Sequence, residues 1–138
     1  MRFSNTEKFR LKMPEQTENQ VQSSILEYLK FHHRVVWAER FNSGAMIEDS
    51  EDGSRNRRYI KFNTLKGCPD IFGMMDDGRL IAIEVKRPSW RKPTCDREKT
   101  QEAFLALCRE HGAIALFASR IEDVATAIAE STKVNENG

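Results

Sequence analysis

The sequence lacks any apolar run that approaches the roughly 20 residues a membrane-spanning helix needs. Cysteine is scarce: Cys68, Cys95 and Cys108 make an odd number and form no Cys-x-x-Cys pair, which disfavours a zinc ribbon or a disulfide framework. The first residues also lack the apolar stretch of a secretion signal. These absences predict an intracellular protein with reduced thiols, neither secreted nor embedded in a membrane.

An excess of one charge is missing as well. The chain carries 22 basic and 21 acidic residues, so its total charge does not mark it as a nucleic-acid binder. The distribution is uneven, because residues 54–66 hold five basic and no acidic side chains, and residues 87–99 hold five basic and two acidic ones. Such segments are either ordinary solvated loops or phosphate contacts. Under the second interpretation, the nucleic-acid-binding candidates are Arg55, Arg57, Arg58, Lys66, Arg87, Trp90, Arg91 and Lys92.

The length of 138 residues suits one domain. We expect a flexible arm over residues 1–16, a domain over 17–130 and a frayed tail over 131–138. Thr17 and Gln20 form a capping box that predicts the start of the first helix. The expected helices are 18–32, 97–111 and 121–130, and the expected strands are 34–41, 70–74, 80–86 and 113–118, with a possible strand at 59–62.

This order, α-β-β-β-α-β-α, predicts an α/β fold with a mixed sheet flanked by helices. Residues 43–57 are rich in turn-forming residues, with Asp52-Gly53 as the expected chain reversal. Asp77-Gly78 predicts a tight hairpin turn between the strands 70–74 and 80–86. There is no internal repeat, and no sequence motif for an organic cofactor is present.

Two charged residues, Glu84 and Lys86, end a strand that is otherwise apolar. Side chains alternate along a strand, so the two share one face of the sheet. Burying a charge without a partner costs roughly several kcal/mol of folding free energy, so each of these groups requires an oppositely charged partner, a metal or water. When these two residues are considered alone, a simple salt bridge between Glu84 and Lys86 at the strand end explains them equally well.

The segment Gly67-Cys68-Pro69-Asp70 leads into the strand that pairs with the one carrying Glu84. The hairpin is expected to bring Asp70 beside Glu84. Two converging carboxylates form a site of hard oxygen ligands, which suits Mg²⁺ or Mn²⁺, and the Val85 carbonyl offers a further oxygen. Lys86 is then placed to orient an attacking water or to stabilise charge on a phosphate.

Two helical residues point to the same place. Glu18 lies at the N-terminal end of the apolar stripe of its helix, where it either favours the helix dipole or supports the metal. Gln101 lies on the inward face of the helix 97–111, as a structural hydrogen-bonding group or as part of the site. Together with Asp70, Glu84 and Lys86, these residues form the predicted catalytic set.

The pattern resembles the PD-(D/E)xK nuclease superfamily, through Pro69-Asp70 and Glu84-Val85-Lys86. It is most similar to the VRR-NUC family of virus-type replication and repair nucleases, whose early helical Glu and later helical Gln correspond to Glu18 and Gln101. The resemblance spans residues 17–118 and implies a restriction-endonuclease-like fold and a metal-dependent endonuclease. Small members resemble Holliday-junction resolvases, which implies a homodimer acting on branched DNA, such as four-way junctions.

Other functions remain open at this point. A non-catalytic nucleic-acid-binding module with a nuclease fold has no need of paired carboxylates beside phosphate. A nuclease of flaps or linear DNA uses the same residues, whereas sequence-specific restriction requires recognition elements that so short a chain hardly accommodates. We therefore expect a structure-selective DNA endonuclease.

Overall fold

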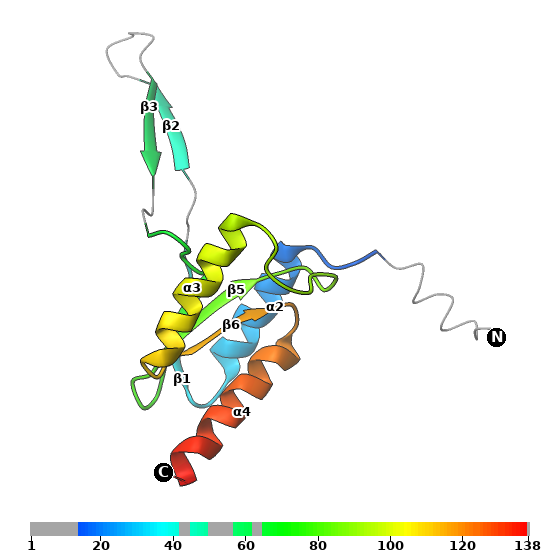
Figure 1. The fold of residues 1–138 in the computed structure, drawn as a ribbon, viewed down its shortest axis with the longest axis vertical. Coiled ribbons are helices and arrows are strands. Elements are labelled where there is room, and N and C mark those ends of the chain that lie inside the picture. Colours follow the sequence, from blue (N-terminus) through cyan, green and yellow to red (C-terminus); the bar gives the residue numbers. More distant parts are fainter. Residues whose placement is uncertain (1–13, 42–44, 50–56, 62–64, 138) are drawn as a thin grey trace, which may run out of the picture.

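A four-stranded mixed sheet forms the centre of the protein (Figure 1). The computed structural model describes residues 14–41, 45–49, 57–61 and 65–137, with side chains for 14–41 and 65–133. The strand order is β1-β4-β5-β6, with antiparallel pairing except between β5 and β6. These strands are β1 (Val35–Arg40), β4 (Ile71–Met75), β5 (Leu80–Val85) and β6 (Ile114–Ala118). The α/β fold with a mixed sheet is confirmed.

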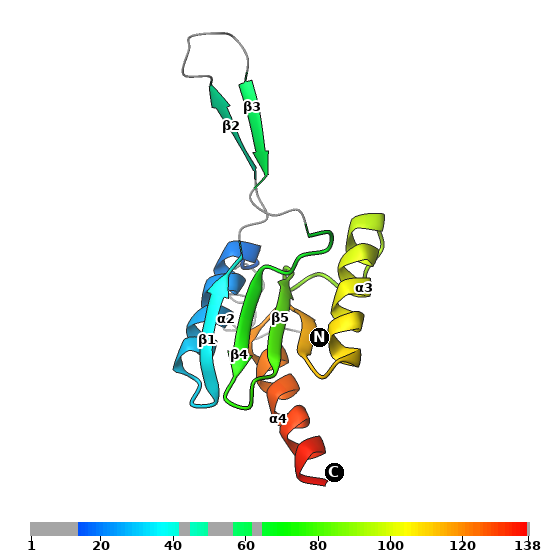
Figure 2. The same cartoon turned by 90° about the vertical axis from the view of Figure 1, so that its left-hand side faces the viewer.

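Three helices cover the two faces of this sheet. One face packs against α2 (Glu18–Phe31) and α4 (Ile121–Asn137), and the other against α3 (Asp96–Glu110). Figure 2 shows α3 on its own side of the strands. The order of these core elements agrees with the restriction-endonuclease-like arrangement that the sequence predicts.

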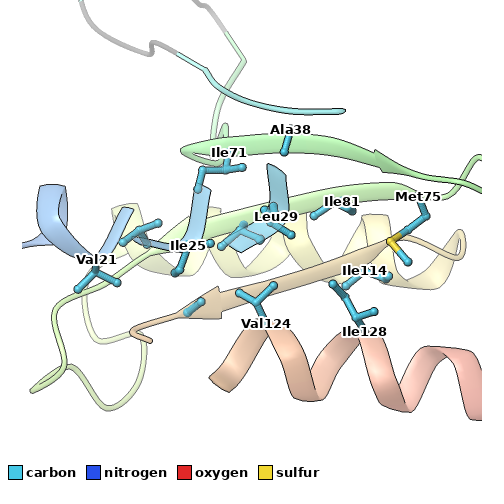
Figure 3. Close-up of a cluster of buried hydrophobic side chains, with 13 residues drawn as sticks. Val21, Ile25, Leu29, Ala38, Ile71, Met75, Ile81, Ile114, Val124 and Ile128 are labelled. Atoms are coloured by element: carbon cyan, nitrogen blue, oxygen red, sulfur yellow. The ribbon is translucent and has the colours of Figure 1, made fainter. Parts of the chain in front are cut away.

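Alternation along β5 divides its side chains between the two faces. Ile81, Ile83 and Val85 enter the larger apolar cluster, which α2 and α4 complete (Figure 3). Ala82 enters the smaller cluster beneath α3, together with Leu105. Each large apolar side chain that is fully buried contributes roughly 1.5–3 kcal/mol, so the packing fixes which face of β5 each residue presents. Glu84 consequently faces α3.

The predicted capping box determines where α2 begins. The Thr17 hydroxyl accepts a hydrogen bond of 3.2 Å from the Gln20 amide, and the Gln20 side chain accepts one of 2.9 Å from the Thr17 amide. These reciprocal bonds satisfy two backbone donors that the first turn would otherwise leave unpaired. Glu18 is therefore the first residue of α2.

A second sheet is formed by β2 (Ala45–Asp49) and β3 (Arg57–Lys61); β3 overlaps the possible strand expected at 59–62, whereas β2 differs from the prediction. The interpretation of 43–57 as turns was wrong at 45–49. The pairing places Glu48 opposite Arg58 and Asp49 opposite Arg57; opposite charges at paired positions favour a sheet, but only the partner strand reveals them. The expected reversal at Asp52-Gly53 lies outside the described residues.

The ends of the chain also differ in part from the prediction. The last helix continues to Asn137, so the tail expected to fray from residue 131 is helical up to that point. Of the predicted arm, residues 1–13 lie outside the described residues, and residues 14–16 precede α2 without regular structure. No helix in the described part of the chain is long and apolar enough to cross a membrane.

Candidate active site

Asp70 and Glu84 lie at opposing positions of the β4–β5 hairpin. The register pairs Ile71 with Ile83, so the residue before β4 stands beside Glu84. The Asp70 carboxylate accepts a hydrogen bond of 2.8 Å from the Val85 amide, and the Asp70 carbonyl accepts one of 2.8 Å from the Phe41 amide. Asp70 is thus held by the strands on both of its sides.

The Glu84 side chain is only 5% exposed. Its Oε1 accepts a hydrogen bond of 3.0 Å from Gln101 Nε2, whereas its buried Oε2 has no hydrogen-bond partner among the described residues. Burial, followed by the negative charge of Asp70, raises the pKa of Glu84 to about 8, although Lys86 and Arg97 act in the opposite direction. A buried oxygen without a partner is rare in folded proteins and marks Glu84 as a candidate functional group.

Gln101 forms hydrogen bonds with both Glu84 and Lys86. It is 4% exposed on the inward face of α3, and its amide group donates to Glu84 while its Oε1 accepts a hydrogen bond of 3.1 Å from Lys86 Nζ. These two bonds fix the orientation of the amide, because a flipped amide would present a donor to the ammonium group. The structure therefore brings Asp70, Glu84, Lys86 and Gln101 together.

The Lys86 ammonium group has three further neighbours. Glu98 Oε2 lies 3.5 Å from Nζ, and the rings of Trp90 and Phe117 have their centroids 5.9 and 5.6 Å away. Cations are attracted to aromatic faces at this range. The ammonium group of Lys86, which directly follows β5, is consequently positioned from several sides.

Glu98 belongs to this network but was absent from the predicted set. It accepts a hydrogen bond from the Trp90 indole, which is the main reason that its pKa lies below the usual value. Glu98 precedes Gln101 by three residues, a spacing that places both on one side of a helix. That spacing is the signal by which the sequence could have revealed it.

Trp90, one of the nucleic-acid-binding candidates, has internal contacts next to Lys86. Its ring packs on Phe117 at a centroid distance of 4.7 Å, and its N–H is bonded to Glu98. These contacts give Trp90 a role in holding Glu98 beside Lys86, and the DNA contact expected of Trp90 stays a prediction.

Gly67 explains the close approach of the segment before β4 to α3. Its φ is +73°, and a Cβ placed there would lie 2.8 Å from the carbonyl oxygen of Thr100. Only glycine combines this backbone conformation with that contact at low cost. The glycine therefore lets the segment that carries Asp70 rest directly on the turn of α3 that carries Gln101.

Glu18 lies at the same end of the fold but is exposed. Figure 2 shows the first turns of α2 and α3, the start of β4 and the end of β5 together at this end. No group of three or more His, Cys, Asp or Glu side chains suited to a metal occurs among the described residues. The carboxylates brought together here are thus Asp70 and Glu84, and the part expected of Glu18 stays a prediction.

The basic candidates lie on the surface where their side chains are described. Lys66, Arg87, Arg91 and Lys92 are exposed, which leaves them accessible to phosphate. Arg55 lies outside the described residues, as do the side chains of Arg57 and Arg58 in β3. The phosphate contacts expected of this set stay predictions.

Comparison with known protein families agrees with this geometry. The family model described as the VRR-NUC domain matches residues 13–119. The chain belongs to the VRR-NUC family. No curated protein and no solved structure matches the chain. Membership of the VRR-NUC family implies a nuclease-type function with DNA as the substrate, and the cluster around Glu84 is the part of the structure where such chemistry fits.

Proposed function

We propose that the protein is a DNA endonuclease that hydrolyses phosphodiester bonds with the aid of Mg²⁺ or Mn²⁺. The observation that carries this proposal is the Glu84 carboxylate, which is buried beside Asp70 with one oxygen unpartnered. Two neighbouring carboxylates repel each other unless a proton or a cation lies between them. A divalent cation would satisfy both groups at once.

The residues present fit such an ion. Asp70 and Glu84 supply hard carboxylate oxygens, the ligands that Mg²⁺ and Mn²⁺ prefer, and the Val85 carbonyl completes the proposed set. Glu18 is proposed as a ligand through water or as a ligand of a second ion. When bound, the ion would lower the pKa of water and stabilise negative charge on the phosphate.

Lys86 contributes a positively charged side chain to this site, in addition to the proposed metal ion. Its ammonium group, held by Gln101 and Glu98, would orient the attacking water or stabilise the charge that develops on the phosphate. Gln101 keeps Glu84 and Lys86 in a fixed relation, which preorganises the site before the substrate arrives. Gln101 is therefore a positioning residue in this proposal.

The proposed substrate is branched DNA, with four-way junctions preferred, and the proposed assembly is a homodimer. Symmetric resolution of a junction requires two nicks related by a two-fold axis, and a dimer of this single-site domain supplies that symmetry. Sedimentation at micromolar concentration is expected to show a dimer. A monomer that cuts linear duplex and junction equally well would contradict both parts.

The test of the function itself is cleavage of linear, flap and four-way DNA in Mn²⁺ and in excess EDTA. We expect cleavage with Mn²⁺ alone, and loss of cleavage in Asp70→Asn. Glu102→Gln is the matched control, because Glu102 lies on α3 next to Gln101 but forms a surface ion pair with Arg109. Full activity in EDTA, or in Asp70→Asn, would exclude the proposed mechanism.

A further inference from the structure

A cavity of about 370 Å³ lies next to the candidate active site, between the segment before β4 and the first turns of α3. Its lining contains Leu65, Lys66, Gly67 and Cys68 on one side and Arg97, Thr100 and Gln101 on the other. Gln101 belongs to both places, because its side chain donates to Glu84. An occupant of this cavity would therefore lie against the residue that holds Glu84 and Lys86 in position.

The two walls each carry one cation. Lys66 and Arg97 are exposed, and neither forms an ion pair or a side-chain hydrogen bond with another described residue. Two other basic residues differ in this respect, because Lys86 pairs with Glu98 and Arg109 pairs with Glu102.

The position of the two cations follows from Gly67. With the Gly67 backbone at φ +73° and no Cβ to meet the Thr100 carbonyl, the segment carrying Lys66 rests on the same turns of α3 that carry Arg97. The cavity is thus bounded by a fixed backbone contact, and its opening presents two positive side chains from different elements. An anion with several acceptor oxygens matches this arrangement.

We propose that this cavity binds a phosphodiester group of the DNA strand adjacent to the bond that is cut, with Lys66 on one wall and Arg97 on the other. This subsite rests on the proposed function, since it assumes a DNA strand at Glu84. The two residues position the strand and take no part in the reaction. In this proposal the DNA strand crosses the end of the sheet, between α3 and the segment before β4.

The test is the salt dependence of DNA binding in EDTA, where cleavage does not interfere. A fluorescent four-way junction is titrated with wild type, Lys66→Gln, Arg97→Gln and the double variant over a range of NaCl concentrations. Each lost phosphate contact lowers the slope of log K against log [NaCl] by about 1. We expect the slope to fall by about 1 in each single variant and by about 2 in the double variant. Arg97→Lys retains the positive charge and should have a slope close to that of wild type.

Lys133→Gln is the matched control. Lys133 is exposed on α4, whose C-terminal part lies at the opposite end of the fold (Figure 2), and the variant removes the same single charge. Unchanged slopes in both Lys66→Gln and Arg97→Gln, or an equal decrease in Lys133→Gln, would overturn the subsite. So would a wild-type protein that binds no DNA.

The outcome is separable from that of the nuclease proposal. A protein that shows the expected slopes but cuts no DNA in Mn²⁺ retains the subsite and loses the proposed activity. A protein that cuts DNA in Mn²⁺ but has unchanged slopes in these variants retains the activity and loses the subsite. Thermal melting of each variant checks that the substitution of an exposed residue leaves the fold intact.

Discussion

Glu84→Gln is expected to stabilise the protein in the absence of metal. Burial and the neighbouring Asp70 raise the pKa of Glu84 from 4.5 to about 8, so the folded state keeps this proton over a range in which the unfolded chain has lost it. Below pH 4.5 both states are protonated and the fold has its full stability. As the pH rises towards 8, the unfolded state is increasingly favoured, and the fold loses stability.

The size of the effect follows from the same two values. One pKa unit corresponds to about 1.4 kcal/mol, so the loss is about 3 kcal/mol at pH 7 and about 5 kcal/mol above pH 8. A glutamine has no proton to lose and can accept from Gln101 while its amide group faces Asp70. The melting temperature of Glu84→Gln in EDTA should therefore exceed that of wild type by roughly 10–20 °C at pH 8, and the difference should shrink to a few degrees at pH 5.

Melting curves in EDTA at pH 5, 6, 7 and 8 measure this difference, with the surface variant Glu102→Gln as the control. A second series with excess Mn²⁺ at pH 8 adds the ligand. At a Mn²⁺ concentration of about 100 times the dissociation constant, the metal should stabilise the wild-type fold by about 2.7 kcal/mol. The melting temperature of Glu84→Gln should stay nearly unchanged. If Glu84→Gln melts below wild type at pH 8, or if the difference is the same at every pH, the reasoning about Glu84 is wrong.

Four further predictions concern the surroundings of Glu84. Lys86→Ala should reduce the cleavage rate by about 10²-fold or more while DNA affinity in EDTA stays close to wild type; a near-normal rate would remove Lys86 from the mechanism. Gln101→Ala should lower the rate per folded molecule, and a lower melting temperature with an unchanged rate would instead assign Gln101 a purely structural role. Glu98→Gln should reduce the rate less than Lys86→Ala, because the ammonium group keeps its bond to Gln101; equal losses would contradict this ranking. Gly67→Ala should destabilise the fold, measured by thermal melting, more than Gly78→Ala, since both have positive φ but only Gly67 meets a backbone oxygen; equal costs would refute that explanation.

Much of the fold could be predicted because local signals specify it. The capping box at Thr17 locates the start of α2, and Asp77-Gly78 predicts the hairpin that aligns Asp70 with Glu84. Two charged residues at the end of an apolar strand draw attention to the site because burial of charge is costly. These signals depend on residues close in sequence, so a single chain is sufficient to recognise them.

The remaining features depend on contacts that the sequence does not display. The spacing of Glu98 from Gln101 places it on the same side of α3, but its contacts with Lys86 and Trp90 depend on the loop after β5. The strand β2 pairs with β3, and their register places acidic positions opposite basic ones. Tertiary contacts of this kind override local propensity, which explains why residues 45–49 were mistaken for turns.

The short turn between β4 and β5 has a consequence at the opposite end of those strands. Because side chains alternate, a slip of one residue in the pairing of Ile71 with Ile83 would exchange the two faces of one strand relative to the other. The carboxylate of Glu84 would then no longer stand beside Asp70. Under the proposed function, the length of the turn at Asp77-Gly78 is therefore a constraint on the active site, and an insertion there should lower activity although it touches no residue of the site.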